Sequence, residues 1–387
     1  MVWWLAFGRL PATTAIRMLA PLLGVIAAGL GVSLVAAGGF VAVFEAAGLT
    51  APAAGWLVDH IGARRALGGS LVAFAVAASV VASAPNWFVF AGALLALGLG
   101  VNVYEAGAVV WLANASSFRE RAAWMGRFEL SWAGGLLIGV PIAGVLSVAS
   151  WRLAYGALAF VAVAARVLVV PRLGAGGEPR AHHLDRATDD LPELSRDHTG
   201  SLRATAVFVS FGVLCGASQM VFVVYGVWLE DRFGFGTAAI GAVAFALGAG
   251  DLVANFANAR YTDRIGKSRS ASLGAMVVVV SALGLATGAD RLVVGVALLA
   301  VLIVGFEFAL LSSKPLLTEL GWRRRGVGVG IGFAGASVSR GVAAVVATTL
   351  YSDHGFAAAA IASAACATCA ALLFRFAVIE PSFETSA

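Results

Sequence analysis

The feature that most constrains the fold is a series of long apolar stretches that contain few charges and are separated by short loops. Hydrophobic residues make up 60% of the 387 positions and charged residues only 12%, which does not suit a water-soluble surface. A hydrocarbon core about 30 Å thick requires roughly 20 apolar residues per helix. The sequence therefore predicts twelve membrane-spanning helices, near residues 12–32, 36–58, 65–84, 87–112, 122–149, 153–171, 204–228, 237–258, 270–288, 291–313, 326–350 and 355–378.

Basic residues are concentrated in alternate loops. Because arginine and lysine in short loops are retained on the cytoplasmic side, this bias predicts the orientation of the chain. A cytoplasmic N-terminus puts most basic residues, Arg9 among them, in the inner segments. The outer loops then hold only Arg152, Arg232 and Arg291. We expect a multi-pass protein of the cytoplasmic (inner) membrane with both termini in the cytoplasm, and the net charge of +5 does not indicate nucleic acid binding.

A polar segment divides the chain into two sets of six predicted helices. Residues 174–203 contain two prolines, many charged residues and no apolar run, so they are expected to form a cytoplasmic linker. The domains on either side are residues 1–173 and residues 204–387. His182 and His183 in the linker are interpreted as solvated side chains, with a metal site as the alternative.

One charged segment occurs twice. The segment GWLVDHIGARR, residues 55–65, is matched by ARYTDRIGKSR, residues 259–269. Four residues reappear 204 positions later, with Asp59, Ile61, Gly62 and Arg65 corresponding to Asp263, Ile265, Gly266 and Arg269. A weaker repeat relates Tyr104-Glu105 to Phe306-Glu307, which lie 202 positions later. The two sets of helices are therefore interpreted as duplicates, an arrangement found in transporters with parallel repeats.

These residues resemble the inner-loop motif of the major facilitator superfamily, Gly-x-x-x-Asp-(Arg/Lys)-x-Gly-(Arg/Lys)-(Arg/Lys), and the resemblance covers essentially the whole chain. The first copy fits at Gly55, Asp59, Gly62 and Arg64, and departs at His60 and Ala63. The second copy fits at Asp263, Arg264, Gly266 and Lys267, and departs at Ala259 and Ser268. The resemblance implies an all-α integral membrane fold of twelve transmembrane helices in two pseudo-symmetric six-helix bundles.

In the family this loop is associated with gating. Asp59 is expected to end a helix and Gly62 to allow a tight turn, so that Arg64 and Arg65 fold back toward the carboxylate or a neighbouring helix end. Charged hydrogen bonds of this kind are worth about 1.5 to 3 kcal/mol each, weak enough to break during transport. The second copy supplies the corresponding gating residues Asp263, Arg264, Gly266, Lys267 and Arg269. The alternative is that the arginines only fix the topology.

The fifth predicted helix contains the segment GGLLIGVPIAG. Its residues Gly135, Gly139, Pro141 and Gly144 resemble the glycine-proline motif of family exporters, although Val140 separates Gly139 from Pro141. Glycine lets helices approach closely, and proline loosens a helix so that it can bend. Ordinary packing of membrane helices is the alternative explanation.

Ionisable residues inside membrane spans cost free energy to insert, so each is a candidate for a substrate or proton site. Glu105 and Glu307 are the leading cavity acids, because the family lines its cavity with the first, fourth, seventh and tenth helices. The other polar candidates are Arg17, Gln219 and Tyr225 on the first and seventh helices, and Glu45, Glu129, Asp251 and Arg340 on helices that form moving interfaces in the family. Structural ion pairs are the alternative for each, and snorkelling toward the headgroups is favoured for Arg127, Arg166 and Lys314.

The fourth predicted helix has no arginine where many proton-coupled exporters of the family carry one. If protons drive the carrier, one of the buried acids must serve the coupling instead. The sequence contains no P-loop, His-Glu-x-x-His or Gly-x-Ser-x-Gly motif, so no enzymatic activity, cofactor or metal is expected. Cys366 and Cys369 are interpreted as small packing residues, with a redox or metal motif as the alternative.

The resemblance implies a secondary active transporter that moves a small solute across the cytoplasmic membrane by alternating access, with proton-coupled efflux as the favoured reading. The alternatives are an uptake symporter or uniporter of the same fold, or a membrane receptor or scaffold that does not transport. The expected partners are a small-molecule solute, protons and the lipid bilayer, without nucleic acid, and the protein is expected to be a monomer.

Overall fold

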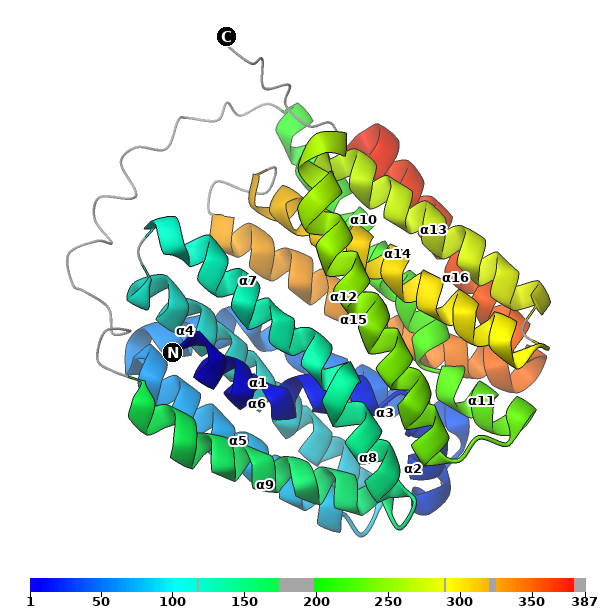
Figure 1. The fold of residues 1–387 in the computed structure, drawn as a ribbon, viewed down its shortest axis with the longest axis horizontal. Coiled ribbons are helices and arrows are strands. Elements are labelled where there is room, and N and C mark those ends of the chain that lie inside the picture. Colours follow the sequence, from blue (N-terminus) through cyan, green and yellow to red (C-terminus); the bar gives the residue numbers. More distant parts are fainter. Residues whose placement is uncertain (117, 174–197, 289, 320–324, 379–387) are drawn as a thin grey trace. The chain divides into compact units, whose positions relative to one another are not determined.

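The computed structural model describes residues 1–116, 118–173, 198–288, 290–319 and 325–378. Within these residues every regular element is a helix, and consecutive long helices run in alternating directions (Figure 1). The predicted linker, with His182 and His183, lies outside the described residues up to position 197. The expected all-helical membrane fold is therefore confirmed.

The first half of the chain forms six candidate membrane spans. The elements in order are α1 (Val2–Met18), α2 (Leu23–Leu30), α3 (Leu34–Ala46), η1 (Ala47–Thr50), α4 (Ala51–Ile61), α5 (Ala63–Ser83), α6 (Trp87–Ala115), α7 (Phe118–Gly134), η2 (Gly135–Gly139), α8 (Val140–Ser147), α9 (Trp151–Val169) and η3 (Val170–Arg172). The first span consists of α1 and α2, the second of α3 to α4, the fifth of α7 to α8, and the sixth of α9 and η3, so four of the six are built from more than one helical segment.

The second half repeats this order. Its elements are α10 (His198–Phe222), α11 (Tyr225–Phe233), α12 (Thr237–Ile265), α13 (Lys267–Gly288), α14 (Leu292–Glu319), α15 (Arg325–His354), α16 (Phe356–Leu372) and η5 (Leu373–Ala377). In the described part of the chain, eleven helical segments are long and apolar enough to cross a membrane, and the bent pair of α1 and α2 is a twelfth candidate. The number of predicted spans agrees with this result.

The first span differs from its prediction. We expected one helix over residues 12–32, whereas α1 already begins at Val2, and α1 and α2 are bent by 75° across a short break. Pro21 lies in the break, and its missing N–H removes a bond from the helical ladder. Arg9, which we had assigned to a cytoplasmic segment, therefore lies in the middle of a helix.

Glycines with positive φ end helices at matching places in the two halves. Gly31 and Gly234 follow α2 and α11 with φ of 65° and 68°, in the left-handed conformation that residues with a Cβ rarely adopt. Gly62 and Gly266 separate α4 from α5 and α12 from α13 with φ of 84° and 94°. The tight turn expected at Gly62 is confirmed, and its counterpart lies 204 positions later in the sequence.

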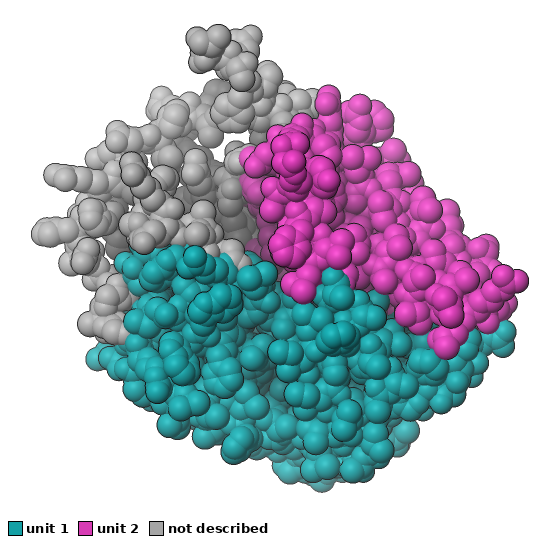
Figure 2. All heavy atoms as spheres, in the orientation of Figure 1, with its two compact units in different colours: residues 1–195, 223–249 teal, residues 196–222, 250–387 magenta. Residues whose placement is uncertain are grey.

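The described helices form two compact units, coloured separately in Figure 2. Unit 1 contains residues 1–195 and 223–249, and unit 2 contains residues 196–222 and 250–387. In unit 1, α5 packs on α6 and α9, and α1 packs on α7 and α9. In unit 2, α13 packs on α14 and α16, and α10 packs on α15 and α16. Corresponding helices thus make corresponding contacts, as expected for a duplicated chain.

Candidate functional site

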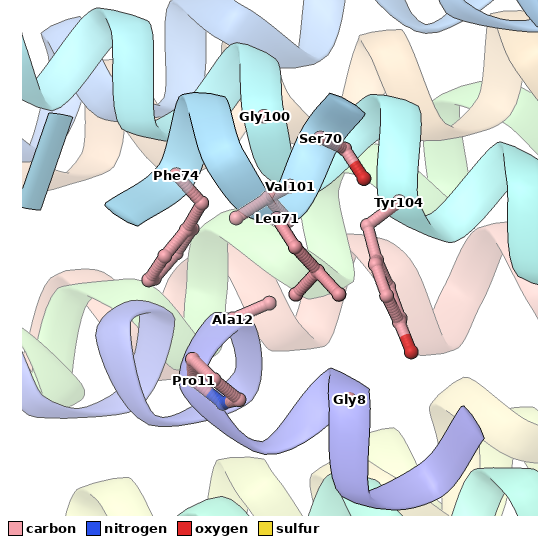
Figure 3. Close-up of a pocket in the computed structure, with 9 residues that line it drawn as sticks. All are labelled: Gly8, Pro11, Ala12, Ser70, Leu71, Phe74, Gly100, Val101 and Tyr104. Carbon is pink, nitrogen blue, oxygen red and sulfur yellow. The ribbon is translucent and has the colours of Figure 1, made fainter. Parts of the chain in front are cut away.

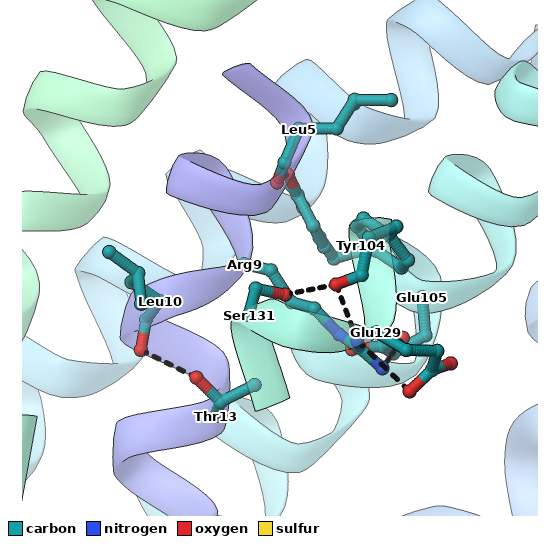
Figure 4. Close-up of polar contacts among 9 residues, drawn as sticks. Leu5, Arg9, Leu10, Thr13, Tyr104, Glu105, Glu129 and Ser131 are labelled. Atoms are coloured by element: carbon teal, nitrogen blue, oxygen red, sulfur yellow. Dashed lines mark hydrogen bonds and ion pairs between the residues drawn. The ribbon is translucent and has the colours of Figure 1, made fainter. Parts of the chain in front are cut away.

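Arg9 is a buried cation in the middle of α1. Its side chain is 6% exposed, and its guanidinium forms a bidentate ion pair with Glu105 of α6. Nε donates to Oε1 at 2.6 Å and Nη2 donates to Oε2 at 2.8 Å (Figure 4). The planar guanidinium matches a carboxylate in this geometry, which offsets part of the cost of removing both charges from water.

Helix α7 supplies the remaining contacts of Arg9. Nη1 lies 3.5 Å from Oε2 of Glu129 and donates to the backbone carbonyl of Phe128 at 3.4 Å. The guanidinium carbon lies 4.3 Å from the centre of the Phe128 ring and 5.4 Å from that of Trp132. The spacing of 128, 129 and 132 places these residues on neighbouring positions of one helical surface. Arg9, Glu105 and Glu129, which we call the Arg9 cluster, therefore join three helices of unit 1.

The Arg9 cluster contains more acids than bases, and the two acids differ in exposure. One guanidinium faces two carboxylates, so the cluster carries one net negative charge when both acids are ionised. The side chains of Glu105 and Glu129 are 28% and 41% exposed, whereas that of Arg9 is 6% exposed. The more exposed Glu129, with its longer ion-pair distance, is the less firmly held acid.

A close approach of α6 to α1 brings Glu105 to Arg9. The hydroxyl of Tyr104 donates to the carbonyl oxygen of Leu5 at 2.7 Å, so the residue before Glu105 is hydrogen-bonded to α1 (Figure 4). Gly8 makes this possible, because a Cβ at this position would collide with the Tyr104 hydroxyl. Gly8 and Tyr104 thus position the ion pair without contributing charge to it.

A second cation lies two turns along α1. The guanidinium carbon of Arg17 lies 4.9 Å from the centre of the Trp132 ring, so Arg9 and Arg17 approach the same indole. Tyr225, at the start of α11, is buried and lies within electrostatic range of Arg17. Two of the polar candidates, Arg17 and Tyr225, therefore lie near each other in unit 1, and their part in a solute site remains a prediction.

The cavity behind α1 is too small for a solute. Gly8, Pro11 and Ala12 of α1 face residues of α5 and α6 around a void of about 10 Å³, comparable to a single water (Figure 3). Its lining is mostly apolar, and the Ser70 hydroxyl is engaged with the carbonyl of Leu67. This void reflects packing between helices and offers no binding site for an organic molecule.

The glycine-proline segment allows helices to pack closely within unit 1. Residues 135–139 form a π-helical turn, η2, before Pro141 in the first turn of α8. A Cβ on Gly135 would lie 3.0 Å from the backbone of Thr13 of α1. A Cβ on Gly139 would collide with Thr14, which also belongs to α1. On α8, a Cβ on Gly144 would lie 2.5 Å from the carbonyl oxygen of Thr237. The expected close approach is therefore present.

The duplicated loops form turns at Gly62 and Gly266, and in the first loop Arg64 contacts the end of a neighbouring helix. Asp59 is exposed and makes no ion pair with a described residue, while Arg64 Nε donates to the carbonyl of Val170 at 3.2 Å. Arg65 is exposed, and Gly55 has open space around its Cα. In the second copy the residues Asp263, Arg264 and Arg269 are exposed, and Gly266 and Lys267 are half-buried. A latch between Asp59 and these arginines remains a prediction.

The other candidates are distributed over both units. Glu45 of α3 is buried in unit 1, and Asp251 of α12 and Glu307 of α14 are buried in unit 2. Gln219 of α10 is half-buried, and Arg340 of α15 donates to the hydroxyl of Ser337 at 3.1 Å. The structure thus brings Glu105 and Glu129 together through Arg9, a residue that our sequence reasoning had placed outside the membrane.

A sequence signal for Arg9 existed. Val2, Leu5 and Ala6 are apolar positions on the N-terminal side of Arg9 and are buried in α1. Their three- and four-residue spacing indicates that the helix extends past Arg9. Glu129 was recognised only as an intramembrane acid, since its proximity to Arg9 depends on how α7 packs. For metal ions, the described side chains include no group of three or more His, Cys, Asp or Glu residues with suitable placement.

Comparisons with known proteins agree with the helical membrane fold. Residues 5–320 match the family model of the Major Facilitator Superfamily. The fold is similar to the crystal structure of the human organic anion transporter MFSD10 (TETRAN), with a TM-score of 0.69 and 19% sequence identity over 96% of this chain and 98% of that chain. A sequence search among curated proteins finds no match. The family match extends over most of the chain, and the protein therefore belongs to the major facilitator superfamily.

Proposed function

We propose that this membrane transporter uses the proton gradient to export a small solute by alternating access. The observation that carries the proposal is the Arg9 cluster, in which one buried cation is shared by two partly exposed carboxylates. Such a cluster can take up one proton and stay paired, which is what coupling requires of an acid inside a membrane. The fourth predicted helix lacks the arginine that many proton-coupled exporters of the family carry. The Arg9 cluster would take over proton coupling in its place.

The direction of transport is supported by the glycine-proline segment. This segment resembles a motif of family exporters, and its glycines allow α8 and η2 to contact α1 and α12 closely. We propose that these contacts loosen and reform during the transport cycle. The gating role proposed for Asp59 and its counterpart Asp263 belongs to the same cycle, because both acids lie beside helix-ending glycines and are exposed.

Organic anions are the first solute class to test. The similar fold belongs to an organic anion transporter, and Arg9 and Arg17 of this chain approach one indole ring. A carboxylate solute would compete with Glu105 for the guanidinium of Arg9 once that acid is protonated. The proposal includes a monomer in the cytoplasmic membrane with cytoplasmic termini, a boundary between six-helix bundles at residues 174–203, and no enzymatic step.

Inside-out membrane vesicles with an acidified lumen test the proposed direction. Each organic anion is added outside, and both its accumulation and the collapse of the pH gradient are measured. A proton-coupled exporter accumulates the solute in the lumen and consumes the gradient. Movement out of the lumen would instead identify an uptake symporter, and movement that is independent of the gradient would identify a uniporter.

The variant Asp59→Asn tests the gating component. We expect transport to fall about tenfold while the melting temperature is unchanged, because Asp59 is exposed and lacks a stabilising ion pair with a described residue. Asp353→Asn, which changes an exposed acid at the end of α15, serves as the control. Full activity of Asp59→Asn would remove the gating role. A protein that binds a solute in equilibrium dialysis but never moves it would be a receptor or scaffold.

A further inference from the structure

Unit 1 contains an open cleft lined by three arginines, at the start of α5 and the end of α9. Its volume is about 520 Å³, and its lining consists of Arg64, Arg65, Gly68, Gly69, Arg166, Val170 and Pro171. We call it the arginine cleft. None of the residues that line it is acidic, although three guanidinium groups face one space.

The three arginines have no counter-charge from the described part of the chain. Arg64 donates one hydrogen bond to the carbonyl of Val170, and neither Arg65 nor Arg166 makes an ion pair with a described residue. Three like charges in one cleft repel one another, so the site favours an anion that they can share. Helix α5 begins at Ala63 without a side-chain cap, and the N–H groups of its first turn add to the positive potential.

Glycine forms the floor of the arginine cleft. Gly68 and Gly69 lie one turn beyond Arg64 and Arg65 on the same face of α5. A Cβ on Gly68 would lie 3.1 Å from Nε of Arg166, so this glycine lets the arginine of α9 extend across α5. Gly69 has no heavy atom within 4 Å of a Cβ position, and the space above it is open.

An apolar surface continues from the cleft along both helices. On α5, Val72, Val76 and Val80 follow Gly68 at intervals of four residues and are exposed. On α9, Phe160 and Val163 precede Arg166, toward the middle of the helix, and both are exposed. Both helices are long enough to span a membrane, so these side chains face lipid unless another molecule covers them.

The end of the cleft carries side chains that are typical of the membrane surface. Arg172 of η3, just beyond Pro171, lies over the ring of Trp4 with 4.5 Å between the guanidinium carbon and the ring centre. Tryptophan and arginine are typical of the interface between hydrocarbon and water. The cleft therefore combines positive charge, a tryptophan–arginine contact beside it and an adjoining apolar surface, which is the pattern expected where a helix meets lipid headgroups.

At the corresponding helix junction of the second half, the described side chains are different. Ser268 and Ser272 of α13 occupy the positions that correspond to Arg64 and Gly68, since Gly62 corresponds to Gly266. Their hydroxyls donate to the carbonyls of Phe374 and Ala371, which closes the junction of α13 with η5 and α16. The described positions that correspond to Arg64 and Gly68 are therefore engaged in hydrogen bonds, and this helix pair provides an internal control.

We propose that the arginine cleft binds the headgroup of an anionic phospholipid, whose phosphate contacts Arg64, Arg65 and Arg166 while an acyl chain lies along α5 and α9. The occupant is a lipid, because its headgroup can bind the three arginines while its acyl chain lies on the adjoining apolar surface, which a free anion would not contact. Basic pockets between membrane helices are known to hold such headgroups. The inference concerns a lipid-facing site and is independent of the solute and of the direction of transport.

The test is lipid retention by the full-length protein. The protein is purified from nanodiscs of phosphatidylcholine with one fifth phosphatidylglycerol, washed in detergent, and analysed by native mass spectrometry. We expect wild type to retain phosphatidylglycerol, and Arg65→Gln/Arg166→Gln to retain at least fivefold less. The control Arg269→Gln/Arg375→Gln removes two exposed arginines from the corresponding junction of the second half and should retain as much as wild type.

Two further measurements keep the proposal falsifiable. Gly69→Phe fills the cleft without changing charge and should also reduce retention, which covers the case in which the double variant does not fold. Inorganic phosphate at millimolar concentration should displace little of the bound lipid. Equal retention by the cleft variants and wild type, equal loss in the control, or full displacement by phosphate would each overturn the lipid site.

Discussion

Two groups of arginine side chains in unit 1 differ in how their charge is balanced. Arg9 is buried among packed helices, and Glu105 and Glu129 of the same chain surround it. The arginines of the arginine cleft lie around an open space that has no carboxylate in its lining. A buried cation must be paired within the fold, because the cost of desolvating it unpaired is several kcal/mol. A cation at an open cleft can instead pair with an anion that is not part of the protein. This difference predicts how each group of arginines responds to substitution.

The largest effect is expected from Arg9→Gln. This change leaves two nearby carboxylates without their cation, and breaking a buried pair costs about 3 to 5 kcal/mol. We expect a large fall in melting temperature in detergent and loss of transport. The double variant Arg9→Gln/Glu105→Gln removes both partners and should recover part of the stability. Wild-type stability of Arg9→Gln would mean that the cluster does not hold the helices together.

The two acids of the Arg9 cluster should differ from each other. Glu105 makes two short hydrogen bonds to Arg9, whereas Glu129 lies 3.5 Å from it and is more exposed. Glu105→Gln is expected to lower the unfolding free energy by about 1 to 3 kcal/mol, and Glu129→Gln by less than about 1 kcal/mol. Chemical denaturation of the two variants in the same detergent measures the difference. The reverse order would contradict the geometry of the cluster.

The same substitution at two glycines compares packing in the two regions. Gly8→Ala adds a methyl group where the Tyr104 hydroxyl contacts α1, and overpacking of this kind costs about 1 to 3 kcal/mol. Gly69→Ala adds a methyl group above the open floor of the arginine cleft and should be neutral or stabilise by up to about 1 kcal/mol. Thermal unfolding of both variants is the measurement. Equal destabilisation would show that the cleft is as closely packed as the cluster.

The smallest effect on stability is expected from Arg65→Gln. Arg65 is exposed and makes no ion pair with a described residue, so the change in unfolding free energy should stay within about 0.5 kcal/mol in neutral lipid. The amount of phosphatidylglycerol that the Arg65→Gln variant retains should fall as salt is added, because exposed charges are screened. A loss of stability as large as that of Arg9→Gln would mean that the cleft has an internal counter-charge.

Much of the fold could be predicted from the sequence because the bilayer imposes a strict local rule. Apolar stretches of about 20 residues predicted the spans, and the repeat of Asp59 and Gly62 predicted matching turns in the two halves. The start of the first helix was wrong, because the apolar stretch was taken to begin near residue 12, which left Arg9 among the residues expected in the cytoplasm. A buried arginine and a loop arginine look alike in sequence, and only the apolar residues before Arg9 distinguish them.

The candidate site could be predicted only in part. Glu105 and Glu129 were recognised as intramembrane acids, but their common partner depends on the packing of α6 and α7 against α1. That packing depends on Gly8, whose role follows from a contact with Tyr104 almost a hundred residues away. The cleft was missed for the same reason, since Arg166 of α9 reaches Gly68 of α5 only in the folded chain.

The most direct test of proton-coupled transport through the Arg9 cluster is solute accumulation in proteoliposomes with an imposed pH gradient. Wild type is compared with Glu105→Gln/Glu129→Gln, and Asp353→Asn serves as the control for loss of an exposed acid. We predict that the gradient stimulates accumulation by wild type and the control at least tenfold, and that the double variant exchanges solute without any stimulation. Full stimulation of the double variant by the gradient would contradict the assignment of coupling to this cluster.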